Sequence, residues 1–296
     1  MDLEIAKMDG ESFKLSDYGI QVRDFIVESI EIIPQYGTIE GRSGRVDYGA
    51  NYGSRSITTP FYIRAHDMLD YPLLRDMLYS LVISRESFYI RELRRPTDKG
   101  YCPDGGVYDD VYVGGKRYKV RLANTINLDQ QRIYGFGELV FETTELPFAE
   151  SIGTSWDIAT KGIKYSHDLW SYGMGLLYDE ESHKYAHAKT EFSIYNPSDI
   201  AIHPFEQELM IKIGPAYNST EFFELENLTT GDLFRVNEGI TNSEVVIDGA
   251  NITINGLQAL RKTNRKFISL APGWNEFKTR GASSARVEFH FRFYYL

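Results

Sequence analysis

Apolar and polar residues alternate along many segments of the chain, as half-buried strands require. One such segment runs from Phe25 to Ile33, where Pro34 is expected to end the strand. Another runs from Ile57 to Arg64, with an expected interruption at Pro60. Near the C-terminus, apolar residues occupy every second position, with polar or charged residues between them: Val287, Phe289, Phe291 and Phe293. The dominant period of two predicts a mainly β fold.

A helical period replaces this alternation between Asp67 and Leu81. An apolar stripe at helical spacing is formed there by Leu73, Leu74, Met77, Leu78 and Leu81. Asp67 or Asp70 can cap the start of this helix, and Pro72 is tolerated because it falls in the first turn. We expect the helix to lie on a sheet and to bury its leucine stripe there.

Turn signals divide the chain into domains. Gly114-Gly115 predicts a hairpin between strands at 111–113 and 116–122, and a strand at 137–143 leads to a boundary near Pro147. Residues 1–148 therefore form an α+β domain with one helix on a sheet. Short strands and regular turns predict a jelly-roll or galectin-like β-sandwich in residues 190–296. The connecting segment 149–189 is rich in aromatic residues and is expected to pack on that sandwich or on a neighbouring subunit.

Composition and charge limit the classes of function that the chain can have. The 296 residues suffice for two separate cores. A formal net charge of −10 argues against wrapping duplex DNA, which needs clustered lysine and arginine. The lone Cys102 excludes an internal disulfide and suits synthesis in a reducing cytoplasm. We expect no signal peptide, because the charged N-terminus lacks an apolar region, and no membrane insertion, because no apolar run is long enough.

Motifs for chemistry are scarce. The chain has no phosphate-binding loop, no complete dinucleotide fingerprint and no nucleophile elbow. Cys102 has no histidine near it in sequence, and the acidic loop 104–110 does not match the spacing of a calcium loop. His183 and His187 are four residues apart but lack a third zinc ligand. Arg91, Arg94, Arg95 and Lys99 are interpreted as a solvated strand end or an interface. We therefore predict no catalytic residue, cofactor or metal, and no enzyme.

The strongest functional signal begins at Gly41-Arg42-Ser43-Gly44. This glycine-rich loop is followed by Tyr48-Gly49, by a strand and by the single helix. That order, together with 272–277 (Pro-Gly-Trp-Asn-Glu-Phe) before the last strand, resembles the distal tail proteins of siphophages, and the resemblance implies a Gram-positive host. The resemblance implies a structural hub at the tail tip of the virion, with residues 1–148 closing a hexameric ring. It places Gly41, Arg42, Ser43 and Gly44 at the ring interface as expected contacts.

The same resemblance implies partners. They are the major tail protein above the ring, a tail-associated lysin or hub protein below it, and a receptor-binding protein on the sandwich domain. DNA would pass through the lumen without specific binding.

A second hypothesis is a lectin-like protein that recognises a cell-wall polysaccharide. Exposed aromatic rings stack on sugars, and Trp170 and Trp274 are the candidates for such contacts, although large rings are more often buried. A third hypothesis, a glycoside hydrolase, requires two carboxyl groups about 5 to 9 Å apart across a cleft. Exposure of the two tryptophans separates the lectin-like hypothesis from a purely structural role.

Overall fold

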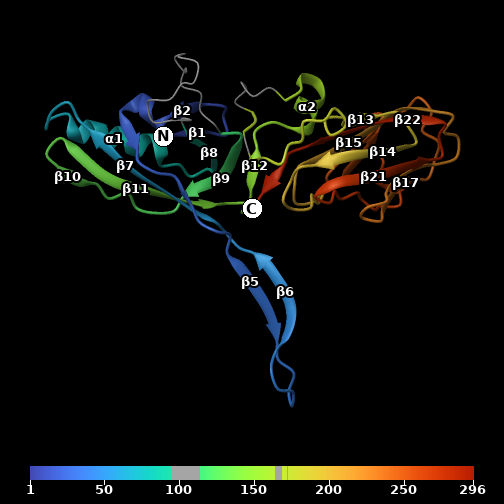
Figure 1. Cartoon of the computed structure of the whole chain (residues 1–296), viewed down its shortest axis with the longest axis horizontal. Helices are drawn as coiled ribbons and strands as arrows, with labels where there is room; N and C mark the ends of the chain where they lie inside the picture. Colours follow the sequence, from blue (N-terminus) through green and yellow to red (C-terminus); the bar gives the residue numbers. More distant parts are fainter. Residues whose placement is uncertain (95–113, 164–168, 172) are drawn as a thin grey trace. The chain divides into compact units, whose positions relative to one another are not determined.

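The computed structural model describes residues 1–94, 114–163, 169–171 and 173–296 (Figure 1). The chain forms two compact units. Unit 1 contains Met1–Ala149 with Leu296, and unit 2 contains Glu150–Tyr295. The described residues are mainly strands, which confirms the predicted fold class.

Unit 1 is built on one antiparallel sheet with the strand order β2-β1-β8-β9-β11-β7-β3. Its strands are β1 Asp2–Ala6, β2 Ser12–Lys14, β3 Ile20–Val22, β7 Ser56–Arg64, β8 Phe88–Leu93, β9 Lys116–Leu122 and β11 Tyr134–Thr143. Two short strands extend it, β4 (Ile26–Val27) on β7 and β10 (Asp129–Gln131) on β11. The first strand of the predicted hairpin at Gly114-Gly115 falls outside the described residues.

Strand β7 is continuous through Pro60, so the predicted interruption is wrong. Proline lacks an N–H group and is tolerated only where the sheet needs no donor. On one side of β7, β3 pairs with residues 61–63 and β4 with residues 57 and 58, which leaves position 60 in the gap between them. The Pro60 carbonyl on this side accepts a hydrogen bond from the Arg23 amide at 2.8 Å. The missing donor therefore costs no ladder bond.

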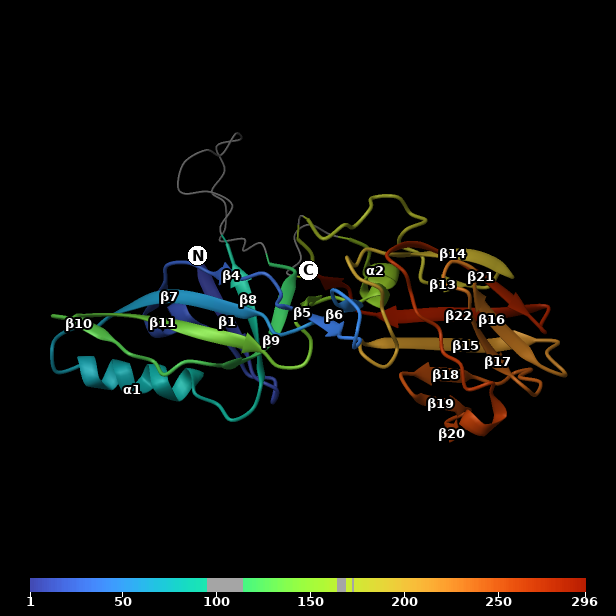
Figure 2. The same ribbon diagram turned by 90° about the horizontal axis from the view of Figure 1, so that it is seen from below.

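The predicted helix is α1, Tyr71–Val82, and it packs along the sheet of unit 1 (Figure 2). Its fully buried residues are Tyr71, Leu78 and Val82, whereas Leu73 is 70% exposed. The buried face of the helix therefore differs from the predicted leucine stripe. Leu73 points to solvent, and Tyr71 and Val82 lie on the buried face with Leu78. The helix starts after Asp70, and the Asp67 Oδ1 atom accepts the backbone N–H groups of residues 69 and 70 at 2.7 and 3.0 Å.

A separate two-stranded hairpin lies between β4 and β7. It consists of β5 (Ile32–Gly37) and β6 (Val46–Tyr52), and Figure 1 shows it extending away from the other strands of unit 1. Pro34 does not end a strand as predicted but lies inside β5. The pairing shifts register between Pro34 and Tyr36, and such a bulge accommodates a residue without an N–H.

Unit 2 contains two antiparallel sheets. The larger has the order β13-β22-β15-β18-β19-β20 and the smaller β14-β21-β16-β17. Their strands are β13 Ala186–His187, β14 Glu191–Asn196, β15 Leu209–Tyr217, β16 Phe223–Asn227, β17 Asp232–Val236, β18 Val245–Asp248, β19 Asn251–Ile254, β20 Leu257–Gln258, β21 Gly273–Arg280 and β22 Ser284–Phe291. The predicted turn at Asn255-Gly256 joins β19 to β20, and both of its residues have positive φ, as a tight hairpin turn requires.

The C-terminal alternation has the predicted orientation. The side chains of Val287, Phe289, Phe291 and Phe293 are fully buried, and the intervening side chains are partly exposed. Three of these side chains, those of Val287, Phe289 and Phe291, lie in β22, and their burial on one face pins its register, because a slip by one residue would expose all three.

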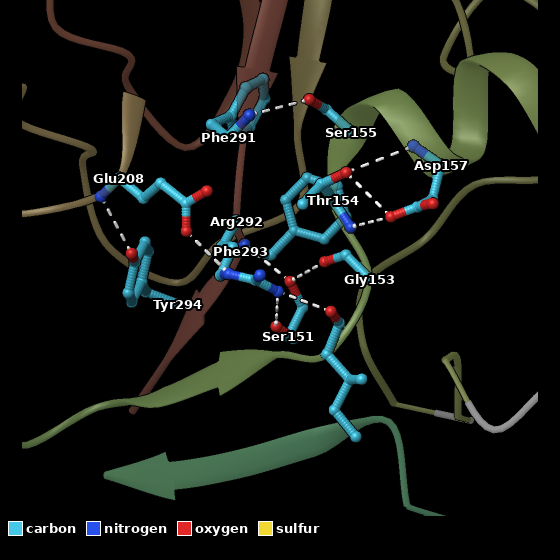
Figure 3. Close-up of polar contacts among 11 residues, drawn as sticks. Ser151, Gly153, Thr154, Ser155, Asp157, Glu208, Phe291, Arg292, Phe293 and Tyr294 are labelled. Atoms are coloured by element: carbon cyan, nitrogen blue, oxygen red, sulfur yellow. Dashed lines mark hydrogen bonds and ion pairs between the residues drawn. The ribbon is translucent and has the colours of Figure 1, made fainter. Parts of the chain in front are cut away.

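Residues 150–161 belong to unit 2, and they form hydrogen bonds with the C-terminal residues 289–293 (Figure 3). Strand β12 (Ala149–Ser151) pairs with β23 (Tyr294–Tyr295), and helix α2 (Ser155–Lys161) follows. Thr154 caps α2: its Oγ1 accepts the Asp157 N–H, and the Asp157 carboxylate accepts the Thr154 N–H at 3.0 Å. No helix in the described ranges is long and apolar enough to span a membrane.

Candidate interaction surfaces

The β5–β6 hairpin exposes an unusual number of large apolar side chains. They are Ile32, Ile33, Tyr36, Ile39, Tyr48 and Tyr52, each between 46% and 67% exposed. A two-stranded hairpin in water is marginally stable at best, and exposed apolar patches commonly mark sites of protein association. The hairpin is therefore the leading candidate for an interface with another chain.

A few internal contacts hold the two strands together. The Tyr48 ring covers Gly37, where an added Cβ would lie 2.3 Å from a ring carbon. The Arg45 guanidinium lies 5.2 Å from the centre of the Tyr36 ring. At the base, the rings of Tyr52 and Phe148 meet edge to face at 5.4 Å. These contacts order the hairpin but leave its apolar surface open.

The predicted interface residues Gly41, Arg42, Ser43 and Gly44 form the tip of this hairpin. All of them are exposed, and Gly41 and Gly44 have φ values of 79° and 89°, which favour glycine. The Arg42 backbone N–H donates to the Ile39 carbonyl at 3.2 Å. Its guanidinium has no ion-pair partner within the part of the chain that the structure describes. The tip is thus available to a second molecule.

A groove opens where β4 leads into the hairpin. We call it the base groove; it has a volume of about 740 Å³, and its lining includes Val27, Ile30, Ile32, Tyr52, Arg55 and Tyr118. Sequence analysis did not single out Arg55, because the tertiary structure alone buries it. Burial raises the pKa of the Tyr118 hydroxyl beside it, and the positive charge of Arg55 acts in the opposite direction.

A second candidate surface lies in unit 2, on the smaller sheet. Trp274 is 42% exposed and lies beside Tyr195, with ring centres 5.2 Å apart. It borders a hollow of about 360 Å³ whose other lining residues are largely polar or charged: Glu181, His187, Lys189, Glu191, Phe192 and Ser193. An exposed indole beside polar groups is the arrangement that sugar recognition requires.

Trp170, the other predicted sugar contact, is buried. It is 6% exposed, and its ring covers Gly153 and lies 5.8 Å from the Phe293 ring. Neither face of this indole is open to a ligand. The two predicted tryptophans therefore do not share a surface role: Trp170 belongs to the interior of unit 2.

The other sequence candidates have local contacts. The Nε2 atoms of His183 and His187 hydrogen bond to the backbone carbonyls of Leu177 and Lys184 at 2.7 and 3.0 Å. Arg91 pairs with Glu4 at 3.2 Å, and Arg94 pairs with Glu92. Arg95, Lys99, Cys102 and the loop 104–110 fall outside the described residues.

One group that sequence analysis did not find is His66, Asp67 and Asp70, whose ligand atoms lie within 4.8 Å of one another. All three residues are exposed. The Asp67 carboxylate already accepts the amides of Leu69 and Asp70 in the turn just before α1, so the arrangement is explained by this turn.

Comparison with known proteins agrees with the order of the two units. Residues 8–143 match the model described as a phage tail protein RIFT-related domain. Residues 206–295 match the model of the C-terminal domain of the siphovirus-type tail component. Each model thus falls within one unit, and the two together match most of the chain. A search of curated protein sequences finds no match.

One solved structure shows the same fold. The crystal structure of the Dit protein (gp 19.1) of phage SPP1, described as a paradigm of the hub adsorption apparatus in phages that infect Gram-positive bacteria, aligns with a TM-score of 0.61. The alignment covers 98% of this chain and 99% of that one, at 13% identity. A structure of the phage P2 baseplate in its activated conformation with Ca aligns at 10% identity with a TM-score of 0.41, covering 99% and 97% of the two chains.

Proposed function

This chain belongs to the siphophage distal tail protein family and is a component of the phage tail hub, and we propose that six copies of it close into a ring. The ring would join the tail tube to the host-recognition apparatus of the virion. The observation that carries the proposal is the β5–β6 hairpin, because its exposed apolar side chains need a neighbouring chain to cover them. Repeated head-to-tail contacts of one kind generate a closed ring when the rotation between copies is suitable.

The proposed partners follow from this position in the tail. The major tail protein contacts one side of the ring, and a tail-associated lysin or hub protein contacts the other. Unit 2 carries the receptor-binding protein. DNA passes through the lumen without specific binding, which suits a chain with a net charge of −10. The protein is made in the host cytoplasm and acts without catalysis.

The test is the mass and shape of the full-length protein, alone and with tube protein, measured by light scattering and negative-stain microscopy. We expect sixfold rings. Ile33→Asp should prevent ring formation, because it places a charge on the apolar surface of the hairpin, whereas Leu69→Asp should not. Leu69 is a matched control because it is 84% exposed but lies outside the hairpin. Monomers under every condition would contradict the proposal.

Arg42 provides a second test at the tip. A guanidinium can bridge to a carboxylate or to several carbonyls of another subunit. Arg42→Ala should therefore weaken assembly while leaving the melting temperature of the monomer nearly unchanged. Equal assembly of the variant and the parent would show that the side chain of Arg42 does not contribute to the interface.

A second candidate function is recognition of a cell-wall polysaccharide by unit 2, favoured by the exposure of Trp274 beside a polar hollow. Titration of the protein with solubilised host polysaccharide, followed by tryptophan fluorescence and calorimetry, tests it. Trp274→Ala should abolish binding, and Tyr217→Ala, which removes an exposed ring elsewhere in unit 2, should not. Absence of binding by the parent protein would leave unit 2 as a protein adaptor.

A further inference from the structure

Arg55 is a buried cation with unused donors. Its side chain is 4% exposed, and neither Nε nor Nη1 has a hydrogen-bond partner among the described residues. The backbone of Arg55 is fixed, because its N–H donates to the Thr143 hydroxyl at 2.9 Å and its carbonyl accepts the Thr143 N–H. The guanidinium also lies 5.9 Å from the centre of the Tyr118 ring. A side-chain hydrogen bond joins the guanidinium to the Tyr118 hydroxyl, but Nε and Nη1 remain without an acceptor, and buried charges are normally paired with one.

The surroundings of Arg55 define the missing acceptor. Arg55 is one of the residues that line the base groove, whose apolar walls include Val27, Ile32 and Tyr52. Glu28 also lines the groove, but its carboxylate forms no ion pair with Arg55 in the described structure. A planar guanidinium with free N–H groups is best satisfied by a carboxylate. The complementary ligand is therefore a carboxylate with an apolar side chain next to it.

We propose that the base groove binds the hairpin tip of a second copy of this chain, an inference that rests on the proposed ring. The Glu40 carboxylate of the tip pairs with Arg55, and Ile39 packs against the apolar walls of the groove. Ile39 is 50% exposed, and Glu40 is exposed and has no ion-pair partner within the described ranges. The two residues are adjacent in sequence, so the tip offers the required charge and apolar surface together.

The positions of tip and groove explain how such a contact extends into a ring. The tip is at the turn between β5 and β6, which Figure 1 shows at the far end of the hairpin. The groove is at the other end, where Ile32 and Tyr52 of the hairpin line it together with residues of the sheet. Each copy therefore carries one tip and one groove on different surfaces. A single tip-to-groove contact leaves one free tip and one free groove on the pair, so further copies can be added head to tail until the last copy meets the first and the ring closes.

A mixing experiment tests this arrangement with the full-length chain. Glu40→Lys reverses the charge of the tip and leaves the groove intact. Ile32→Gln places a polar amide in the apolar groove wall, adds no charge with which the tip variant could pair, and leaves the tip intact. Each variant alone should assemble at least about tenfold more weakly than the parent, as loss of about 1.4 kcal/mol would produce. An equal mixture should stop at heterodimers, because each pair has only one intact contact. Glu86→Lys, a charge reversal at an exposed position of unit 1 outside the hairpin and the base groove, is the control and should form rings normally.

The fold of each variant is checked by its melting temperature, and Arg55→Gln gives a third, more direct variant if it remains folded. Rings from Glu40→Lys at parental concentrations would overturn the contact. Strong weakening of ring assembly by Glu28→Gln would also overturn the contact, because it would identify Glu28 as the partner of Arg55.

A crosslink separates this inference from the proposed ring. In a Cys102→Ser background, chains carrying Ile39→Cys are mixed with chains carrying Val27→Cys under mild oxidation. We expect a disulfide-linked dimer that requires both substitutions and that an added Glu40→Lys suppresses. Rings without this crosslink would overturn the tip-to-groove contact while leaving the ring intact. Absence of both rings and crosslink would overturn both proposals.

Discussion

The Ser155 hydroxyl connects the first turn of α2 to the backbone of β22. It is fully buried, donates to the Phe289 carbonyl at 2.8 Å and accepts the Phe291 N–H at 3.0 Å. Ser155→Ala would leave two buried backbone groups unpaired, which should lower the free energy of unfolding by about 1–3 kcal/mol. Urea denaturation measures this loss. Ser193→Ala, at a partly exposed position of β14, should change stability little, and equal effects of the two would contradict the assigned role.

His290 links stability to pH. Burial lowers its pKa below 6.5, although the Glu288 carboxylate at 3.3 Å acts in the opposite direction, and Lys212 adds a further lowering charge. The ring stacks on Trp156 with centres 4.4 Å apart. The unfolded chain therefore binds a proton more readily than the folded one, so stability is greatest above pH 6.5 and falls as the pH drops through that value.

The measurement is the urea midpoint between pH 5 and pH 8. His290→Gln should reduce its pH dependence, with a remaining slope from His187, whose pKa burial also lowers. His66→Gln should leave the pH dependence unchanged, because the side chain of His66 is 90% exposed. A parental midpoint that rose on acidification across this range would show that the sign of the His290 contribution is wrong.

At the scale of the element, helix α1 offers two leucines in opposite environments. Leu78 is fully buried on the sheet, and Leu73 is 70% exposed. Leu78→Ala removes buried methyl groups and leaves a cavity, so it should destabilise unit 1 by about 2–5 kcal/mol. Leu73→Ala should stay within about 0.5 kcal/mol of the parent. Thermal and urea unfolding of the two variants check the observed orientation of the helix, and the reverse order would favour the sequence-based stripe.

At the scale of the whole molecule, we predict no hydrolytic activity. A glycosidase acid needs a raised pKa, whereas hydrogen bonds and charge from Lys184 and Lys278 lower the pKa values of Glu181 and Glu191, the carboxyls that line the Trp274 hollow. Purified protein incubated with host cell walls should release no reducing ends or new amines above buffer. Release that a single Asp or Glu substitution abolishes, with the fold intact, would establish an enzyme.

Local patterns in the sequence predicted the features that depend on local physics. The period-two alternation at 287–293 identifies a strand with one buried face whichever sheet covers it, and the Asn255-Gly256 turn needs only the backbone freedom of its two residues. The same holds for helix α1 and for the exposed loop at Gly41–Gly44. Such features are set by neighbours a few residues away, and sequence shows those neighbours directly.

Long-range contacts decided the rest. Pro60 is accommodated because β3 and β4 leave a gap beside it, and sequence contains no trace of that gap. Trp170 is buried and Trp274 exposed, although both are aromatic residues in polar surroundings along the chain. In the sequence, Arg55 is indistinguishable from an arginine on the surface, but in the structure the surrounding strands bury its side chain. Burial depends on which distant segments cover a side chain, so only the tertiary structure could reveal the unpaired guanidinium and the groove beside it.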